Sequence, residues 1–82
     1  EYINASLIYY TLGDYEACIK QGRQALKLDP KNAVTYNNIC SAYNGLGKYQ
    51  EAIKACEQAL RIAPDFTMAR NNLTAAKKAL NP

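Results

Sequence analysis

Cysteine has the widest chemical reach of the residues in this chain, since a thiolate can bind a metal, attack a substrate or form a disulfide. Three cysteines occur, Cys18, Cys40 and Cys56, far apart and with no Cys-x-x-Cys pair. Histidine is absent, so the four-ligand zinc spacings are missing and we expect no metal. Each cysteine falls on an apolar stripe, where a thiol acts as a small buried hydrophobe. We therefore expect free thiols, which favours a reducing compartment.

Side-chain amides are the second group of residues that could bind a ligand. The stretch YNNICSAYN, residues 36–44, combines an apolar stripe with three asparagines and a serine, and it carries no charge. These polar residues are mediocre helix formers because their side chains compete for backbone hydrogen bonds. An Asn amide offers one acceptor and two N–H donors, which suits it to pair with a peptide bond. The stretch therefore indicates a surface for binding rather than an ordinary solvent face.

Catalysis is not indicated by the remaining residue types. There is no histidine for base catalysis, and no glycine-rich phosphate loop follows a strand pattern. The seven carboxylates lie mostly in expected turns or beside Lys and Arg, whereas acid–base catalysis needs a pair clustered in a cleft. We expect no enzyme and no cofactor.

The charge pattern argues against nucleic acid and membrane partners. The net charge of +3 is mild, and basic residues alternate with acidic ones along most of the chain. No apolar run approaches the length of a membrane span, and no signal segment opens this fragment. The compartment is undetermined, with the cytoplasm favoured by the expected free thiols.

An internal repeat organises the chain. A shift of 34 residues, without a gap, superimposes many identical residues. The matched pairs include Tyr2 and Tyr36, Tyr9 and Tyr43, Tyr15 and Tyr49, and Pro30 and Pro64. One asparagine recurs in every unit, as Asn4, Asn38 and Asn72.

Each unit contains the residues that are typical of the ends of two helices. The sequences LGDY and LGKY are turn signals, and a proline after the second helix disfavours helix in the residue before it. Apolar residues between these marks recur at helical spacing, with no competing strand pattern. Helices are expected at about residues 1–12, 15–28, 33–45, 49–62 and 66–80.

These residues resemble the tetratricopeptide repeat family, whose signature is W-x2-L-G-x2-Y, then A-x3-F, then P over 34 residues. The second unit reads Tyr36-x2-Ile39-Cys40-x2-Tyr43, then Ala52-x3-Cys56, then Ala59 and Pro64. The resemblance implies an all-α fold of about five helices, in which antiparallel helix-turn-helix repeats stack as a short right-handed α-solenoid. Residues 1–82 would form one domain: repeat 1 at about 1–30, repeat 2 at about 31–64 and a capping helix at about 65–82. We expect it to be a fragment of a longer array.

Gly22 departs from the family pattern, because a large aromatic residue is typical at its position. Glycine inside a helix costs about 1 kcal/mol relative to alanine, and it leaves a space that another residue must fill. Either neighbouring tyrosines fill it or the first repeat is loosely packed.

The resemblance also implies where a partner binds. In this family the first helix of each repeat lines a concave surface that binds extended peptides or partner helices. The expected function is therefore a protein–protein interaction scaffold that binds an extended peptide or partner segment in a neutral, Asn-rich groove. The expected peptide-binding residues are Asn4, Leu7, Tyr10, Asn37, Asn38, Ser41, Asn44, Asn71, Asn72, Ala75 and Lys78.

Alternatives remain open from the sequence. The recurring asparagine is similar to the asparagine ladder of O-linked N-acetylglucosamine transferase, or else it hydrogen-bonds within its own repeat. The chain also has an apolar N-terminal helix that would support self-association into a homo-oligomer. A third reading is a substrate-presenting repeat tail of a larger enzyme, such as a glycosyltransferase.

Overall fold

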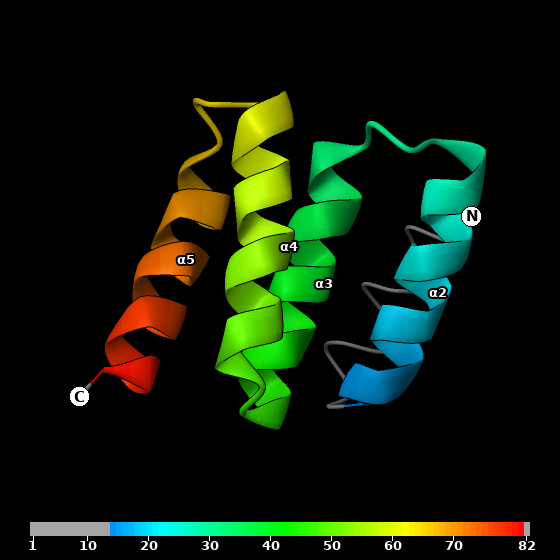
Figure 1. Ribbon diagram of the computed structural model, residues 1–82. Helices are drawn as coiled ribbons and strands as arrows, with labels where there is room; N and C mark the ends of the chain where they lie inside the picture. Colours follow the sequence, from blue (N-terminus) through cyan, green and yellow to red (C-terminus); the bar gives the residue numbers. More distant parts are fainter. Residues whose placement is uncertain (1–13, 82) are drawn as a thin grey trace.

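The computed structural model describes residues 14–81 as four antiparallel helices joined by short turns (Figure 1). They are α2 (Tyr15–Leu28), α3 (Ala33–Leu46), α4 (Tyr49–Ile62) and α5 (Thr67–Leu80). The expected boundaries of these helices agree with the structure to within one residue. The helix expected at 1–12, and with it the apolar segment expected to dock on another copy, lies outside the described residues.

Local side chains define where the helices begin and end. Asp14 and Asn32 cap α2 and α3, each with its side-chain oxygen accepting a backbone N–H of the first turn. α3 ends at Gly47, which has a φ of 77°. This left-handed conformation favours glycine, so the LGKY sequence stops α3 and turns the chain into α4.

The helix α3 is the centre of the described fold. It packs against α2, α4 and α5, while α4 also packs against α5. α2 and α4 flank α3 without approaching each other. This arrangement is the stacking of helix pairs expected for a short α-solenoid.

Small side chains make up most of the core. The fully buried residues include Ala42, Ala52, Ala59, Ala69 and Ala76 together with the three cysteines. Small residues let helix backbones approach closely, and larger aromatic and aliphatic side chains then pack around the edge of the contact. That rim consists of Tyr15, Leu26, Tyr36, Tyr43, Leu46, Tyr49, Ile53, Leu60, Phe66 and Leu73.

Ile39 of α3 occupies the space beside Gly22. A Cβ atom added at Gly22 would lie 2.7 Å from Ile39 Cγ1 and 2.9 Å from Ile39 Cδ1. The missing aromatic side chain of the first repeat is therefore replaced by an aliphatic one from the next helix. Neither expected explanation of the Gly22 position, filling by tyrosines or loose packing, is needed.

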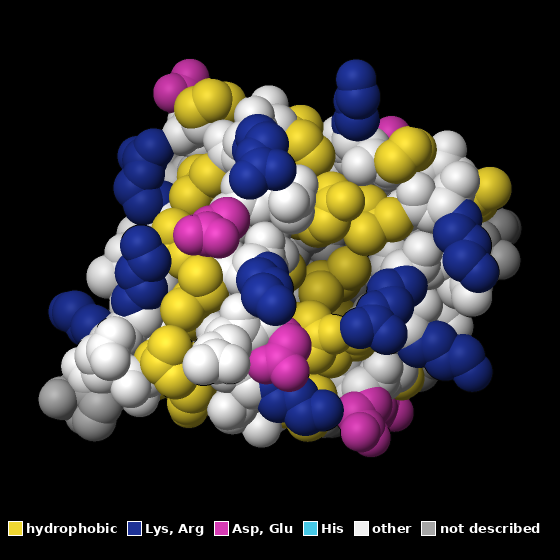
Figure 2. Space-filling model, viewed as in Figure 1, with side chains coloured by type: hydrophobic (Ala, Val, Ile, Leu, Met, Phe, Trp, Pro, Cys, Tyr) yellow, Lys and Arg dark blue, Asp and Glu magenta, His cyan; other side chains and the backbone are white. Residues whose placement is uncertain are grey.

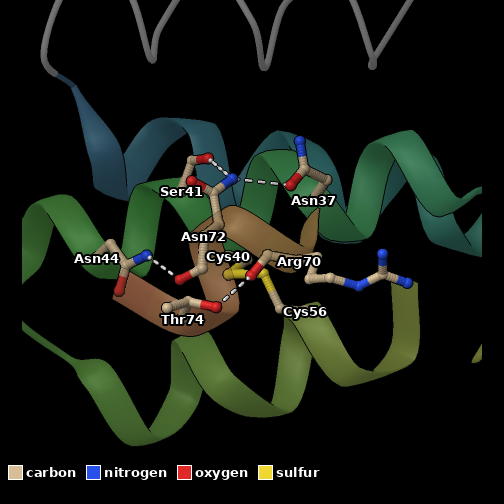
Figure 3. The surroundings of a disulfide bond; sticks show 8 residues. All are labelled: Asn37, Cys40, Ser41, Asn44, Cys56, Arg70, Asn72 and Thr74. Carbon is tan, nitrogen blue, oxygen red and sulfur yellow. Dashed lines mark hydrogen bonds between the residues drawn. A yellow bond between two sulfur atoms is a disulfide. The ribbon is translucent and has the colours of Figure 1, made fainter. Parts of the chain in front are cut away.

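The expectation of free thiols is wrong for two of the three cysteines. Cys40 of α3 and Cys56 of α4 form a disulfide across the helix pair, with Cα atoms 5.4 Å apart (Figure 3). The two cysteines are 16 positions apart in the sequence, but the distance between their Cα atoms suits a disulfide. The interpretation of Cys40 and Cys56 as free, buried thiols is therefore wrong, and the argument for a reducing compartment loses its basis. Cys18 is buried outside this bond.

Gly22→Ala tests the close approach of α2 and α3. The new methyl group clashes with Ile39, and overpacking costs about 1–3 kcal/mol, which exceeds the gain in helix propensity of about 1 kcal/mol. We expect a lower free energy of unfolding in urea. In an Ile39→Ala background the clash is gone, so the same substitution becomes neutral or stabilising. An equal effect of Gly22→Ala in both backgrounds would contradict this account.

Thiol titration under denaturing conditions tests the disulfide. Protein purified without reductant should show one reactive thiol per chain, and three after reduction. Because the bond closes a loop of 16 residues, reduction should lower the free energy of unfolding by about 3 kcal/mol. Cys18→Ala serves as the control and should leave no reactive thiol before reduction. Three reactive thiols in the unreduced protein would exclude the bond.

Candidate functional site

A polar hydrogen-bonded contact joins α3 to α5. Asn72 of α5 donates both hydrogens of its side-chain amide, one to Asn37 Oδ1 at 2.8 Å and one to Ser41 Oγ at 2.8 Å. Asn44 Nδ2 in turn donates to the backbone carbonyl of Asn72 at 3.2 Å. Figure 3 shows the Asn72 amide between Ser41 and Asn37. We refer to these four residues, Asn37, Ser41, Asn44 and Asn72, as the asparagine seam.

The seam follows from the spacing of its residues. Asn37, Ser41 and Asn44 recur at intervals of four and three, so they lie on one stripe of α3. Tyr36, Ile39 and Tyr43 lie on a different stripe of the same helix. The uncharged side of α3 therefore faces α5, where buried amides and a hydroxyl find partners in one another.

Burial divides the expected peptide-binding residues into three groups. Asn37 is only 3% exposed, so its side chain belongs to the contact between helices. Asn38, Ser41, Asn44 and Asn72 are half-buried. Asn71, Ala75 and Lys78 of α5 are exposed. Asn4, Leu7 and Tyr10 lie outside the described residues.

The recurring asparagine does not have the same role in each unit. Asn72 of the last helix hydrogen-bonds to Asn37 and Ser41 of the preceding repeat, rather than within its own unit. The side chain of Asn38 makes no hydrogen bond with residues 14–81, and its backbone oxygen accepts one from Cys18 Sγ at 3.9 Å. The residues 34 positions before Asn37 and Ser41 are Ile3 and Leu7, whose side chains cannot accept a hydrogen bond. The sequence thus repeats the asparagine without repeating its acceptors.

The electrostatics of this side of the molecule are simple. α3 contains no charged residue, and the only charged residues of α5 are Arg70, Lys77 and Lys78. Asn44 Oδ1 is buried and accepts no hydrogen bond from the described part of the chain. Hydrogen bonding to uncharged groups is the chemistry that α3 offers, and α5 adds cations near its start at Arg70 and in its last turn at Lys77 and Lys78.

Residues 14–81 contain no arrangement suited to metal binding or membrane insertion. No group of three or more Cys, Asp or Glu side chains within them is placed to hold a metal ion. None of the helices described is both long enough and apolar enough to cross a bilayer.

A hollow lies over the stripe of α3 that contains Tyr36, Ile39 and Tyr43, with α2 on one side and α4 and the preceding Lys48 on the other. It consists of two cavities of about 440 and 380 Å³ that share Arg23 and Tyr43. We refer to them together as the outer groove. This groove was not predicted from the sequence, because Tyr36 and Tyr43 served there only as markers of the repeat. Both are half-buried and line the groove. The signal that could have revealed it is the row of basic residues on one side of α2.

Comparisons with known proteins agree with this architecture. The family model described as "Tetratricopeptide repeat" matches residues 33–66, and a second, described as "TPR repeat", matches residues 7–47. A solution structure of the first TPR domain of the human RPAP3 protein is similar, with a TM-score of 0.93 and 29% sequence identity over 96% of this chain. This chain spans 62% of the length of that solved chain. No curated protein sequence matches the chain.

The repeat period, the paired helices and both family models lead to one assignment: the chain belongs to the tetratricopeptide repeat family.

Proposed function

We propose that the side of the molecule formed by α3 and α5 binds an extended, uncharged or acidic segment of a partner protein. Family membership supports the coarser role of a protein–protein interaction module. Our proposal adds which side of the molecule binds the partner and which class of peptide it recognises.

The observation that carries the proposal is an amide on an uncharged helix whose side chain makes no hydrogen bond within residues 14–81. Asn38 is half-buried, and its side chain makes no hydrogen bond with residues 14–81. Asn71 of α5 is exposed and likewise makes none with them. Each amide can donate two hydrogen bonds and accept others. Each can therefore pair with the backbone of an extended peptide, whatever side chains the peptide carries.

The asparagine seam supports these side chains. Because Asn72 is bonded to Asn37, Ser41 and Asn44, α3 and α5 have a defined spacing. A binding site gains affinity when its groups are held in place before the ligand arrives. Asn72 is therefore assigned to support, while Asn38 and Asn71 are assigned to contact.

Charge restricts the class of peptide. α3 and α5 carry no carboxylate, so nothing on this side pairs with a basic ligand. Lys78 is exposed in the last turn of α5, where a carboxylate of the ligand would form a charge-assisted hydrogen bond. An acidic group on the peptide would therefore lie near that end of α5.

Alanine substitution of the contact residues tests the proposal. A displayed library of peptides of about 12 residues, enough to span two repeats, is first selected against the whole chain. We expect Asn38→Ala and Asn71→Ala each to weaken the selected peptides about tenfold in fluorescence anisotropy, since each removes hydrogen bonds worth about 1 kcal/mol or more. Thermal unfolding should be unchanged.

Gln50→Ala is the matched control, because it removes an exposed amide from α4. It should leave peptide affinity unaltered. If the selected peptides bind Asn38→Ala and Asn71→Ala as tightly as the parent chain, the α3–α5 side is not the binding site.

Asn72→Ala distinguishes support from contact. The substitution leaves the buried Asn37 Oδ1 without its donor, and an unsatisfied buried polar group costs about 1–3 kcal/mol. We expect a loss of that size in urea unfolding, and a negligible one for the adjacent Asn71→Ala. Unchanged stability of Asn72→Ala with lost peptide binding would instead make Asn72 a direct ligand contact.

A further inference from the structure

The outer groove has an apolar half. The cavity of about 440 Å³ is floored by Tyr36, Ile39 and Tyr43 of α3 and walled by Leu26 of α2 and Ala55 of α4. Figure 2 shows this hollow as apolar side chains between the charged residues of its two banks. Cavities of this size accept one or two large side chains.

The other half of the groove is basic. The cavity of about 380 Å³ is lined by four cations and a single carboxylate, that of Glu16. The four cations are Lys20, Arg23, Lys27 and Lys48. None of them forms an ion pair with an acidic residue in the described part of the chain, and together they outnumber the one carboxylate that lines this cavity. In the apolar half, by contrast, two cations face two carboxylates, Glu51 and Glu57.

Arg23 and Tyr43 connect the two halves. The Arg23 guanidinium donates a hydrogen bond to the Tyr43 hydroxyl, and both residues line both cavities. Arg23 is exposed, so its remaining N–H donors face solvent. A guanidinium in this position can form a bidentate pair with a carboxylate while its aliphatic part covers the apolar floor.

We propose that the outer groove binds an acidic amphipathic segment of a partner protein. Its large apolar side chains enter the half lined by Leu26, Tyr36 and Ile39. Its carboxylates face Lys20, Lys27 and Lys48. The apolar floor supplies the buried anchor sites of the interface. The excess of cations in the other half makes the groove prefer an acidic partner.

This site is separate from the α3–α5 side. The outer groove uses the stripe of α3 that contains Tyr36, Ile39 and Tyr43, and the asparagine seam uses another stripe. The two proposals therefore stand or fall independently, and the chain would hold two partner segments on different sides.

A set of synthetic peptides tests the charge preference. The probe is a fluorescein-labelled amphipathic peptide of about 14 residues, similar in length to α2 and α4, with Leu and Phe on one face and Glu on the other. A second peptide replaces every Glu with Gln, and a third replaces Leu and Phe with Ala. We expect the Glu peptide to bind at least about tenfold more tightly than either of the others.

Charge reversal in the protein locates the site. Lys20→Glu should weaken the Glu peptide about tenfold, whereas Lys31→Glu, the same change in an exposed turn outside the groove, should alter affinity less than about twofold. Lys48→Glu is a second groove variant that is safe for folding, because an acidic residue at the start of α4 suits the helix dipole. It should weaken binding as Lys20→Glu does.

Three outcomes would overturn the proposal. The first is equal affinity for the Glu and Gln peptides. The second is Lys20→Glu and Lys48→Glu variants that bind like Lys31→Glu. The third is a chain that sediments as a dimer which Lys20→Glu dissociates, because the occupant would then be a second copy. Unchanged peptide binding in Asn71→Ala supports the proposal, since it excludes the α3–α5 side as the place of binding.

Discussion

The structure depends on one charge-free helix that packs against three others. Apart from two alanines, a cysteine and a leucine, α3 consists of Tyr, Asn, Ser, Gly and β-branched residues, which are weak helix formers. Its stability must therefore come from packing against α2, α4 and α5. Each stripe of α3 contributes differently: Ile39 lies over Gly22 of α2, Cys40 is bonded to Cys56 of α4, and Asn37 and Ser41 accept hydrogen bonds from α5.

This arrangement leaves two surfaces of different chemistry. Towards α5, α3 presents amides and a hydroxyl that hydrogen-bond to Asn72. Between α2 and α4, it presents aromatic and aliphatic side chains beneath a row of cations. α2 and α4 both pack against α3 but not against each other. One side of α3 therefore stays uncovered between them. A groove between them is a consequence of that stacking.

The disulfide illustrates how sequence position and spatial position differ. Cys40 and Cys56 each fall on the apolar stripe of a different predicted helix. The sequence therefore predicted a small buried residue at each position, with no link between them. Whether two thiols bond depends on Cα distance and side-chain direction, and neither is encoded in a spacing of 16 residues. Only the crossing of α3 and α4 decided it.

The sequence by itself determined the repeat, the class of fold and the helix boundaries, because turn glycines, prolines and helical periodicity act over a few residues. It also located the uncharged stripe of α3. The tertiary structure decided what each side chain meets. Asn38 and Asn72 are equivalent in the repeat, yet Asn72 is bonded inside the chain because the preceding first helix carries Asn37 and Ser41, whereas residues 3 and 7 are Ile and Leu. The contact between Gly22 and Ile39 and the outer groove likewise depend on contacts between helices. Local sequence patterns do not predict such contacts.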